Sequence, residues 1–260
     1  MKTQNMTRYG LMTWAILIYG FLYLPVLLLV LFSFNTSTTT ALWKGFTLQW
    51  YVKMFQNHEV LIALKNSLLI AVISTIIAIV FGTLAALAMH KYVFRGKNVW
   101  NGIVTINLIV PEIVAALSLL MLFVFMKIRL NMGTIIIGHT VYSISLVIII
   151  VRARLHGFNQ ALEEVSLDLG ATPVQTFRYV TLPLIMPGIV SAALLCFVLS
   201  FDDFVMTFFL QGTGMKTLPV YIYTKIKRGL TPEVNAVSTL LLAFTGIVIL
   251  MLSLFERRNS

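Results

Sequence analysis

The sequence is poor in charge, in acidic residues and in cysteine. Charged side chains make up 11% of the 260 residues and hydrophobic ones 59%, whereas an ordinary globular chain carries about 25% charged residues. This composition excludes a soluble domain and indicates an integral membrane protein. The single cysteine, Cys196, lies in an apolar run, so it excludes an internal disulfide and is expected to pack as a small hydrophobic residue.

The chain also lacks the residue patterns of an ATPase or a metalloenzyme. The segment GTGMKT at 212–217 does not have the four-residue interval that separates the glycine of a phosphate-binding loop from its Gly-Lys pair. The four histidines are scattered over different segments, and no nucleophile has an adjacent base. We therefore expect a non-catalytic chain that binds no metal and no cofactor. His139, inside an apolar segment, is interpreted as a hydrogen-bonded packing residue rather than a proton carrier.

Long apolar segments dominate the chain, and each can cross a bilayer core, which requires about 20 helical residues. They cover approximately residues 11–34, 66–89, 99–126, 134–151, 185–210 and 235–254. We therefore predict an all-α integral membrane protein with six transmembrane helices in one domain, 1–260. An even number of crossings places both termini on one side of the membrane, with the segment 211–233 on the other.

Lysine and arginine do not set the orientation of these helices. Ten of the 19 basic residues fall on the side of the termini and nine on the other, so the positive-inside rule gives no clear answer. The formal charge of +10 is spread over both membrane surfaces. This spread argues against a nucleic-acid footprint and fits contact with lipid headgroups and acidic partner proteins.

A polar stretch, Ala161–Pro183, lies between two apolar runs, within a longer loop at 152–183. Asn159 can cap a short helix that Gly170 would end. Thr172 is a plausible second N-cap, with Pro173 at the first helical position, and the proline that closes the stretch should end this second helix. The pattern predicts a helix–turn–helix at a membrane surface.

The spacing within this loop resembles the "EAA" cytoplasmic loop of permease subunits of binding-protein-dependent ABC importers. Glu164 is followed by Gly170 and, after nine intervening residues, by the segment Val180–Pro183. Val165 and Ser166 stand where that family has two alanines. The resemblance implies a type I ABC importer permease (MetI-like) fold with a cytoplasmic helix–turn–helix coupling loop and cytoplasmic termini; an unrelated structured connector is the alternative. The residues expected to couple to the ATPase are Glu163, Glu164, Asp168, Leu169, Gly170, Ala171 and Phe177.

Three of the nine acidic residues, Glu112, Asp202 and Asp203, fall inside apolar segments. An aspartate at the bilayer centre costs about 2.5–3.5 kcal/mol, and the last four segments contain no lysine or arginine to neutralise it. We therefore expect these acids to face a wet cavity or to bind a cation. Neighbouring helical positions differ by about 100°, so Asp202 and Asp203 can share one cavity only where the helix is distorted. The alternative is that one acid caps a broken helix.

Aromatic residues near these acids would suit an amine cation through charge pairing and cation–π attraction, whereas an oxyanion would be repelled. The candidate substrate contacts in the pathway are Glu112, Asp202, Asp203, Phe204 and Tyr223.

Segments over nearly the whole chain resemble the second permease subunit of spermidine/putrescine ABC importers. They include PEIV at 111–114, LSFDDFV at 199–205 and TLPVYIYTKIKRGLTPEVNA at 217–236. Where that family carries Pro-Asp, this chain has Pro111-Glu112, which keeps the charge and is one methylene longer. The resemblance implies a second homologous permease, two ATPase subunits that hold ATP and Mg, and an extracytoplasmic polyamine-binding protein, all at a bacterial inner membrane. The binding protein is expected to dock on the segment 211–233, whose basic residues otherwise form a solvated face.

Two other functions are consistent with the residues. One is a permease of the same architecture for another small amine or cationic solute. The other is an ion-coupled secondary transporter in which Glu112 or Asp202 binds a proton or sodium; the absence of a visible inverted repeat counts against it.

Overall fold

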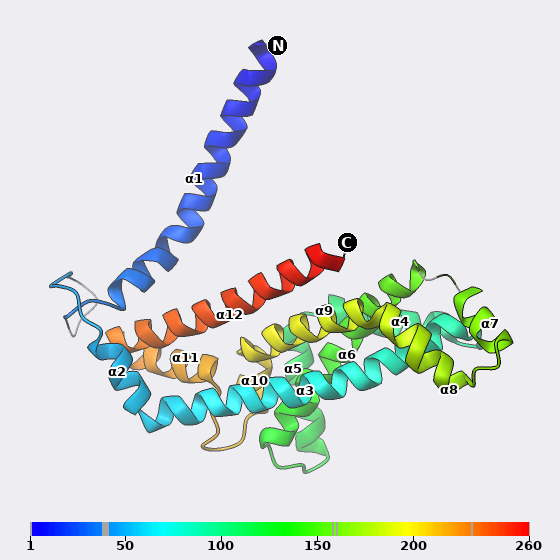
Figure 1. Cartoon of the computed structure of the whole chain (residues 1–260). Coiled ribbons are helices and arrows are strands. Elements are labelled where there is room, and N and C mark those ends of the chain that lie inside the picture. Colours follow the sequence, from blue (N-terminus) through cyan, green and yellow to red (C-terminus); the bar gives the residue numbers. More distant parts are fainter. Residues whose placement is uncertain (1, 38–41, 158, 160, 230, 260) are drawn as a thin grey trace. The chain divides into compact units, whose positions relative to one another are not determined.

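The computed structural model describes residues 2–37, 42–157, 159, 161–229 and 231–259. Over these residues the regular secondary structure is helical (Figure 1), and strand-like pairing is limited to an isolated bridge between Asn35 and Phe46. The predicted all-α fold is therefore confirmed.

Five helical runs are long and apolar enough to cross a membrane. They are Leu11–Phe32 in α1 (Lys2–Phe32), His58–Lys91 (α3), Met132–His156 (α6), the run Pro173–Phe201, and Pro232–Leu254 in α12 (Pro232–Asn259). The remaining predicted span, 99–126, consists of two helices, α4 (Lys97–Ile109) and α5 (Glu112–Phe125), and makes a sixth crossing if the pair counts as one span.

The prediction of one continuous helix over 99–126 is wrong, because the chain bends by 109° between α4 and α5. Pro111 lies between them and has no amide hydrogen to continue the helix of α4. Proline also disfavours a helical conformation in the residue before it, and Val110 is accordingly extended, with φ −60° and ψ 129°. Pro111 therefore divides the span and does not merely kink it.

The predicted helix over 185–210 is also interrupted. The helix α9 (Leu182–Phe201) ends before Asp202, and a short helix, α10 (Val205–Leu210), begins three residues later. The following segment, 211–233, includes the helix α11 (Leu218–Arg228), which was not predicted. The helix α12 starts at Pro232, three residues before the predicted span 235–254.

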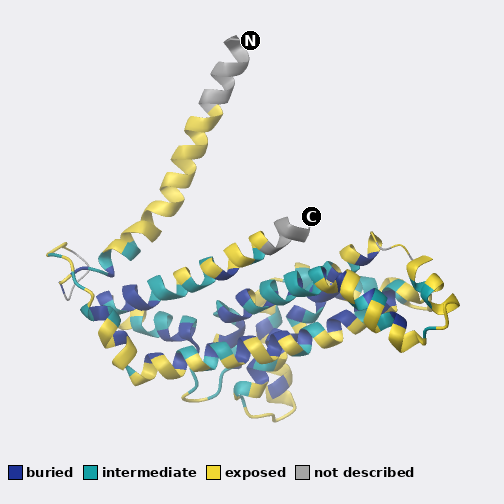
Figure 2. Cartoon of the chain, in the orientation of Figure 1, coloured by how far each residue is buried: buried dark blue, intermediate teal, exposed yellow. Residues whose placement is uncertain are grey.

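The described residues form two compact units, and the single transmembrane domain expected over 1–260 stays a prediction. The first unit comprises Met1–Leu61 and Ile222–Ala243. Within it, the side chains of α1 are exposed from Leu11 to Leu28 (Figure 2), which suits contact with lipid or with another chain. The short helix α2 (Gln49–Gln56) is fixed by Trp50, whose Nε1 donates to the Asn35 carbonyl oxygen at 2.7 Å.

The second unit, Ile62–Tyr221 and Phe244–Ser260, contains the main hydrophobic core. Val147 and Val151 of α6 pack there with Ile185 and Ala192 of α9. The helix α3 approaches α6 closely, because a Cβ built on Gly82 would lie 2.7 Å from Val147 Cβ, as expected for small residues between membrane helices. A second cluster joins α5, α6 and α10, so the broken segments are held against one continuous helix.

Candidate transport site and coupling loop

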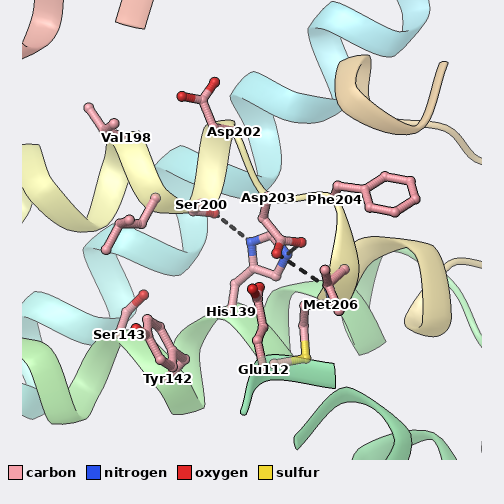
Figure 3. Close-up of a pocket in the computed structure, with 12 residues that line it drawn as sticks. Glu112, His139, Tyr142, Ser143, Val198, Ser200, Asp202, Asp203, Phe204 and Met206 are labelled. Carbon is pink, nitrogen blue, oxygen red and sulfur yellow. Dashed lines mark hydrogen bonds and ion pairs between the residues drawn. The ribbon is translucent and has the colours of Figure 1, made fainter. Parts of the chain in front are cut away.

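A cavity of about 380 Å³ lies where the broken helices meet α6 (Figure 3). The twelve residues that line it are Glu112, His139, Tyr142, Ser143, Val198, Leu199, Ser200, Asp202, Asp203, Phe204, Val205 and Met206. Four of the five predicted pathway residues are among them. The fifth, Tyr223, lies on α11 beside Lys227, whose Nζ is 5.3 Å from the ring centroid; its role in the pathway stays a prediction.

Glu112 reaches the cavity because the chain turns sharply at Pro111. The turn places Glu112 in the first turn of α5, where the helix dipole favours a carboxylate. The Glu112 side chain is directed into the cavity, and its carboxyl group faces that of Asp203 (Figure 3). A straight helix over 99–126 would not have provided this helix N-terminus.

The interruption between α9 and α10 allows Asp202 and Asp203 to line the same cavity. The Asp203 carboxylate accepts hydrogen bonds from the backbone N–H groups of Thr207, at 2.8 Å, and Met206, at 3.3 Å, and from the Thr207 hydroxyl, at 2.9 Å. Asp203 therefore caps α10, the alternative role that the sequence left open. Asp202 points elsewhere, and its two oxygens accept from the Thr245 hydroxyl of α12 at 3.0 and 2.9 Å.

His139 belongs to the site, although the sequence assigned it only to packing. Its side chain is 3% exposed. Nε2 lies 3.0 Å from Asp203 Oδ1 and 3.1 Å from Thr207 Oγ1, and Nδ1 lies 2.6 Å from Ser200 Oγ. The prediction of a hydrogen-bonded histidine is confirmed, but its acidic partner was missed. An ionisable residue in the middle of an apolar segment was the available signal.

The charges that line the cavity favour a cation. Three acidic residues line it, and among the described residues its lining includes no lysine or arginine. Tyr142 and Phe204 add aromatic rings to the lining, which attract organic cations. Because charges in an apolar surrounding are poorly screened, this set of groups can attract an ammonium ion and repel an anion.

The coupling loop has the turn that the sequence predicted. The helix α7 (Ala161–Asp168) is preceded by Asn159, whose side-chain oxygen accepts from the Ala161 N–H at 3.1 Å. Gly170 follows α7 with φ +88°, a left-handed conformation that favours glycine. Thr172 then caps α8 (Pro173–Thr176) in a capping box with Gln175.

The second helix of the loop does not end at Pro183, which corrects the prediction. The helix α8 continues through a π-helical turn, η1 (Phe177–Thr181), directly into α9. In this turn the Leu182 N–H bonds to the carbonyl oxygen of Phe177, five residues earlier. Pro183 follows immediately in the first turn of α9. A wider turn at that point accommodates a residue that lacks an amide hydrogen.

Most of the predicted coupling residues are on the outside of the loop. Glu164, Asp168, Gly170 and Leu169 are exposed, Leu169 by 84%, and Ala171 is partly exposed.

Glu163 and Phe177, in contrast, hold the loop to the helix bundle. Phe177 packs against the core cluster. Glu163 Oε2 lies 2.6 Å from Lys91 Nζ at the end of α3, and its other oxygen accepts from the Thr181 hydroxyl. Burial raises the pKa of Glu163, but the bonds from Lys91 and Thr181 outweigh it and hold the pKa below the ordinary value of 4.5.

The sequence matches the family model "Binding-protein-dependent transport system inner membrane component" over residues 78–258. It is 37% identical over 253 residues to the spermidine/putrescine transport system permease protein PotC of Escherichia coli K12, covering 97% of this chain and 95% of that protein. It is also 37% identical to the putrescine transport system permease protein PotI of the same organism, covering 90% of this chain and 88% of the relative.

The fold is similar to that of solved ABC importers. The crystal structure of a bacterial ABC transporter involved in the import of alginate has a chain that matches with a TM-score of 0.77 and 17% identity, covering 98% of this chain and 96% of that one. A bacterial alginate ABC transporter in complex with an alginate pentasaccharide-bound periplasmic protein matches with a TM-score of 0.75 and 18% identity, covering 99% and 96%. At these identities the likeness establishes the fold alone.

Proposed function

Because this chain belongs to the family of binding-protein-dependent transport system inner membrane components, we propose that it is a permease subunit of an ATP-driven polyamine importer. With a homologous permease it forms the pathway through which spermidine or putrescine crosses the inner membrane. The 37% identity to two polyamine permeases over at least 90% of this chain supports this substrate class.

The cavity carries the proposal, because its chemistry matches an amine. A protonated polyamine offers several ammonium groups joined by short alkyl segments. Glu112 and Asp202 can pair with the ammonium groups, and Phe204 and Tyr142 can contact the alkyl segments and attract the charge. The volume of about 380 Å³ is within the range of small-molecule sites, about 300–1,000 Å³.

The chain itself does not hydrolyse ATP in this proposal. Two ATPase subunits bind ATP and Mg, and their closure moves the coupling loop, which rests on α9 and, through Glu163, on α3. The exposed residues Leu169 and Asp168 support the loop as the docking surface. This arrangement requires the loop and both termini to be cytoplasmic.

An extracytoplasmic polyamine-binding protein docks on the segment 211–233 in this proposal. Part of the basic charge there is already engaged within the chain, since Lys225 Nζ lies 3.6 Å from Glu59 Oε2 and Lys227 lies over Tyr223. We therefore assign a large part of the binding energy between this segment and the binding protein to residues of the segment other than Lys225 and Lys227.

The function is tested by transport in vesicles that contain the purified complex with its co-purifying subunits. Labelled spermidine or putrescine should accumulate only when ATP is present in the compartment that the ATPase subunits face. Other amines should compete with this uptake in proportion to their charge. Uptake that this chain supports alone with a pH or sodium gradient would identify a secondary transporter instead. Uptake of a different small cation, with no competition by polyamines, would identify the same architecture with another substrate.

The cavity is tested by neutralising its acids. Asp202→Asn and Glu112→Gln should each lower polyamine uptake about tenfold or more, since a charged hydrogen bond contributes about 1.5–3 kcal/mol. Glu59→Gln, which removes an acid outside the cavity, is the matched control and should retain most of the activity. Wild-type uptake after neutralisation of Glu112, Asp202 and Asp203 together would contradict the proposed site.

A further inference from the structure

The three acids of the cavity differ in the number of hydrogen-bond donors that already satisfy them. Asp203 accepts four bonds, from two backbone N–H groups, the Thr207 hydroxyl and His139 Nε2, and its side chain is only 8% exposed. Asp202 shares one donor, the Thr245 hydroxyl, between both oxygens. Glu112 lies at an exposed position at the start of α5, and its carboxyl group faces that of Asp203 and has no contact with the backbone amides of α10 that Asp203 caps.

His139 lies at the centre of a buried chain of hydrogen bonds that connects three helices. A carboxylate only accepts hydrogen bonds, so Nε2 carries the hydrogen directed at Asp203 Oδ1. Nδ1 can then accept from the Ser200 hydroxyl at 2.6 Å, and Ser200 Oγ lies 3.1 Å from Ser74 Oγ of α3. Because the Ser200 hydrogen is directed at His139, the one hydrogen of the Ser74 hydroxyl extends the chain to α3 when it points to Ser200 Oγ; the Ile70 carbonyl oxygen, at 2.7 Å, is its other acceptor.

We propose that His139 is a positioning residue that fixes Asp203 as the cap of α10, so that Glu112 and Asp202 are the carboxyl groups this chain offers to the transported cation. The interrupted helix has four orphan N–H groups at the start of α10, and Asp203 satisfies two of them. His139 Nε2 holds the carboxylate in that orientation at Oδ1, the same oxygen that accepts from the Thr207 N–H (Figure 3).

This assignment gives Asp203 and Asp202 different tasks, although they are adjacent in the sequence. Turning Asp203 toward a substrate would uncover the Met206 and Thr207 amides and leave buried His139 without its acceptor, which is costly in an apolar surrounding. Asp202 loses nothing comparable when a cation approaches, because its oxygens keep the Thr245 hydroxyl and still have free lone pairs. The recognition of amine charge therefore depends on Asp202 and Glu112.

Two substitutions of His139 separate its donor to Asp203 from its contact with Ser200. Glutamine places an amide N–H near the position of Nε2, whereas asparagine reaches only as far as Nδ1. In the purified complex, hydrogen exchange of the Met206 and Thr207 amides in His139→Gln should stay within about twofold of wild type. In His139→Asn exchange should be about fivefold faster or more, the effect of losing a helix cap of typical strength. Equal exchange in both variants, whether slow or fast, would overturn the proposal.

The transport assay supplies a second readout, which rests on the proposed function. His139→Asn should lower the uptake rate of spermidine and of putrescine by the same factor and leave their ratio within about twofold of wild type. Asp202→Asn should change that ratio about fivefold or more, since a lost ion pair weighs differently on amines with different numbers of charges. A changed ratio in His139→Asn, or an unchanged one in Asp202→Asn, would overturn the proposal.

The two proposals can fail separately. Absence of any polyamine uptake by the wild-type complex would refute the polyamine function, while amide exchange at Met206 and Thr207 still tests His139 without a substrate. If His139→Asn does not assemble, Asp203→Asn tests the other half of the proposal, that Asp203 serves the cap and not the cation, because it keeps an acceptor for the cap and removes the charge. Its amide exchange within about threefold of wild type, with an unchanged spermidine to putrescine ratio, supports the assignment; a changed ratio overturns it.

Discussion

Replacing Gly170 with valine tests whether the turn of the coupling loop transmits force. Gly170 has φ +88°, and a Cβ built on it meets no atom within 4 Å, so the substitution adds backbone strain without a steric clash. A left-handed conformation costs about 1–2 kcal/mol for residues with a Cβ, and a β-branched residue is at the upper end. We expect the turn to open, ATP-driven uptake to fall at least tenfold, and the membrane helices to remain folded.

The assay compares uptake, co-purification of the ATPase and the thermal midpoint of the complex in one preparation. Gly96→Val is the matched control, because Gly96 also has a positive φ, +92°, and no atom within 4 Å of a built Cβ. It should lose similar stability and keep coupled uptake. Gly170→Asn should be close to wild type, since asparagine tolerates this conformation. Wild-type uptake by Gly170→Val, or an equal loss in Gly96→Val, would refute the reasoning.

Two further substitutions test how the loop and the core are held. Glu163→Gln should lower the thermal midpoint at neutral pH. The lowered pKa of Glu163 stabilises the fold only while the carboxylate is charged, so the difference from wild type should disappear as the pH falls below about 4.5. A difference that persists in acid would contradict the ion pair with Lys91. Gly82→Ala should destabilise the complex by about 1–3 kcal/mol, since its Cβ would meet Val147 Cβ at 2.7 Å. Gly102→Ala, in open space within α4, is the control and should be neutral or stabilising.

Local chemistry predicted the coupling loop almost residue by residue. Gly170 and the pair Thr172-Pro173 have strong conformational preferences of their own, and the turn and the cap follow from them. The error at Pro183 arose because the π-helical turn before it depends on the continuing helix and not on the proline alone. The tendency of Pro183 to end a helix was outweighed by the apolar run that follows it.

The site was predicted by composition and only partly by geometry. Buried charge in an apolar segment identified Glu112, Asp202 and Asp203 as functional candidates, since such charge is costly without a purpose. The sequence could not give the 109° bend between α4 and α5, because a proline in a membrane helix often produces only a kink. The partner of His139 also could not be read from spacing, because Asp203 is 64 positions away and meets it only after α9 has ended.

The uninterrupted helix from Pro173 to Phe201 has a mechanical consequence for the transport cycle. Its 29 residues form a rod of about 43 Å at 1.5 Å per residue, which reaches from the turn at Gly170 to the edge of the cavity. A shift applied at the loop end is carried toward Asp202 along this run, which can bend at the π-helical turn η1 and at Pro187; the helix is first interrupted at the gap before Val205. Asp202, which we propose as a partner of the cation, and Asp203, which caps α10, both lie at that gap, so a movement of the helix would change the distance between their carboxyl groups.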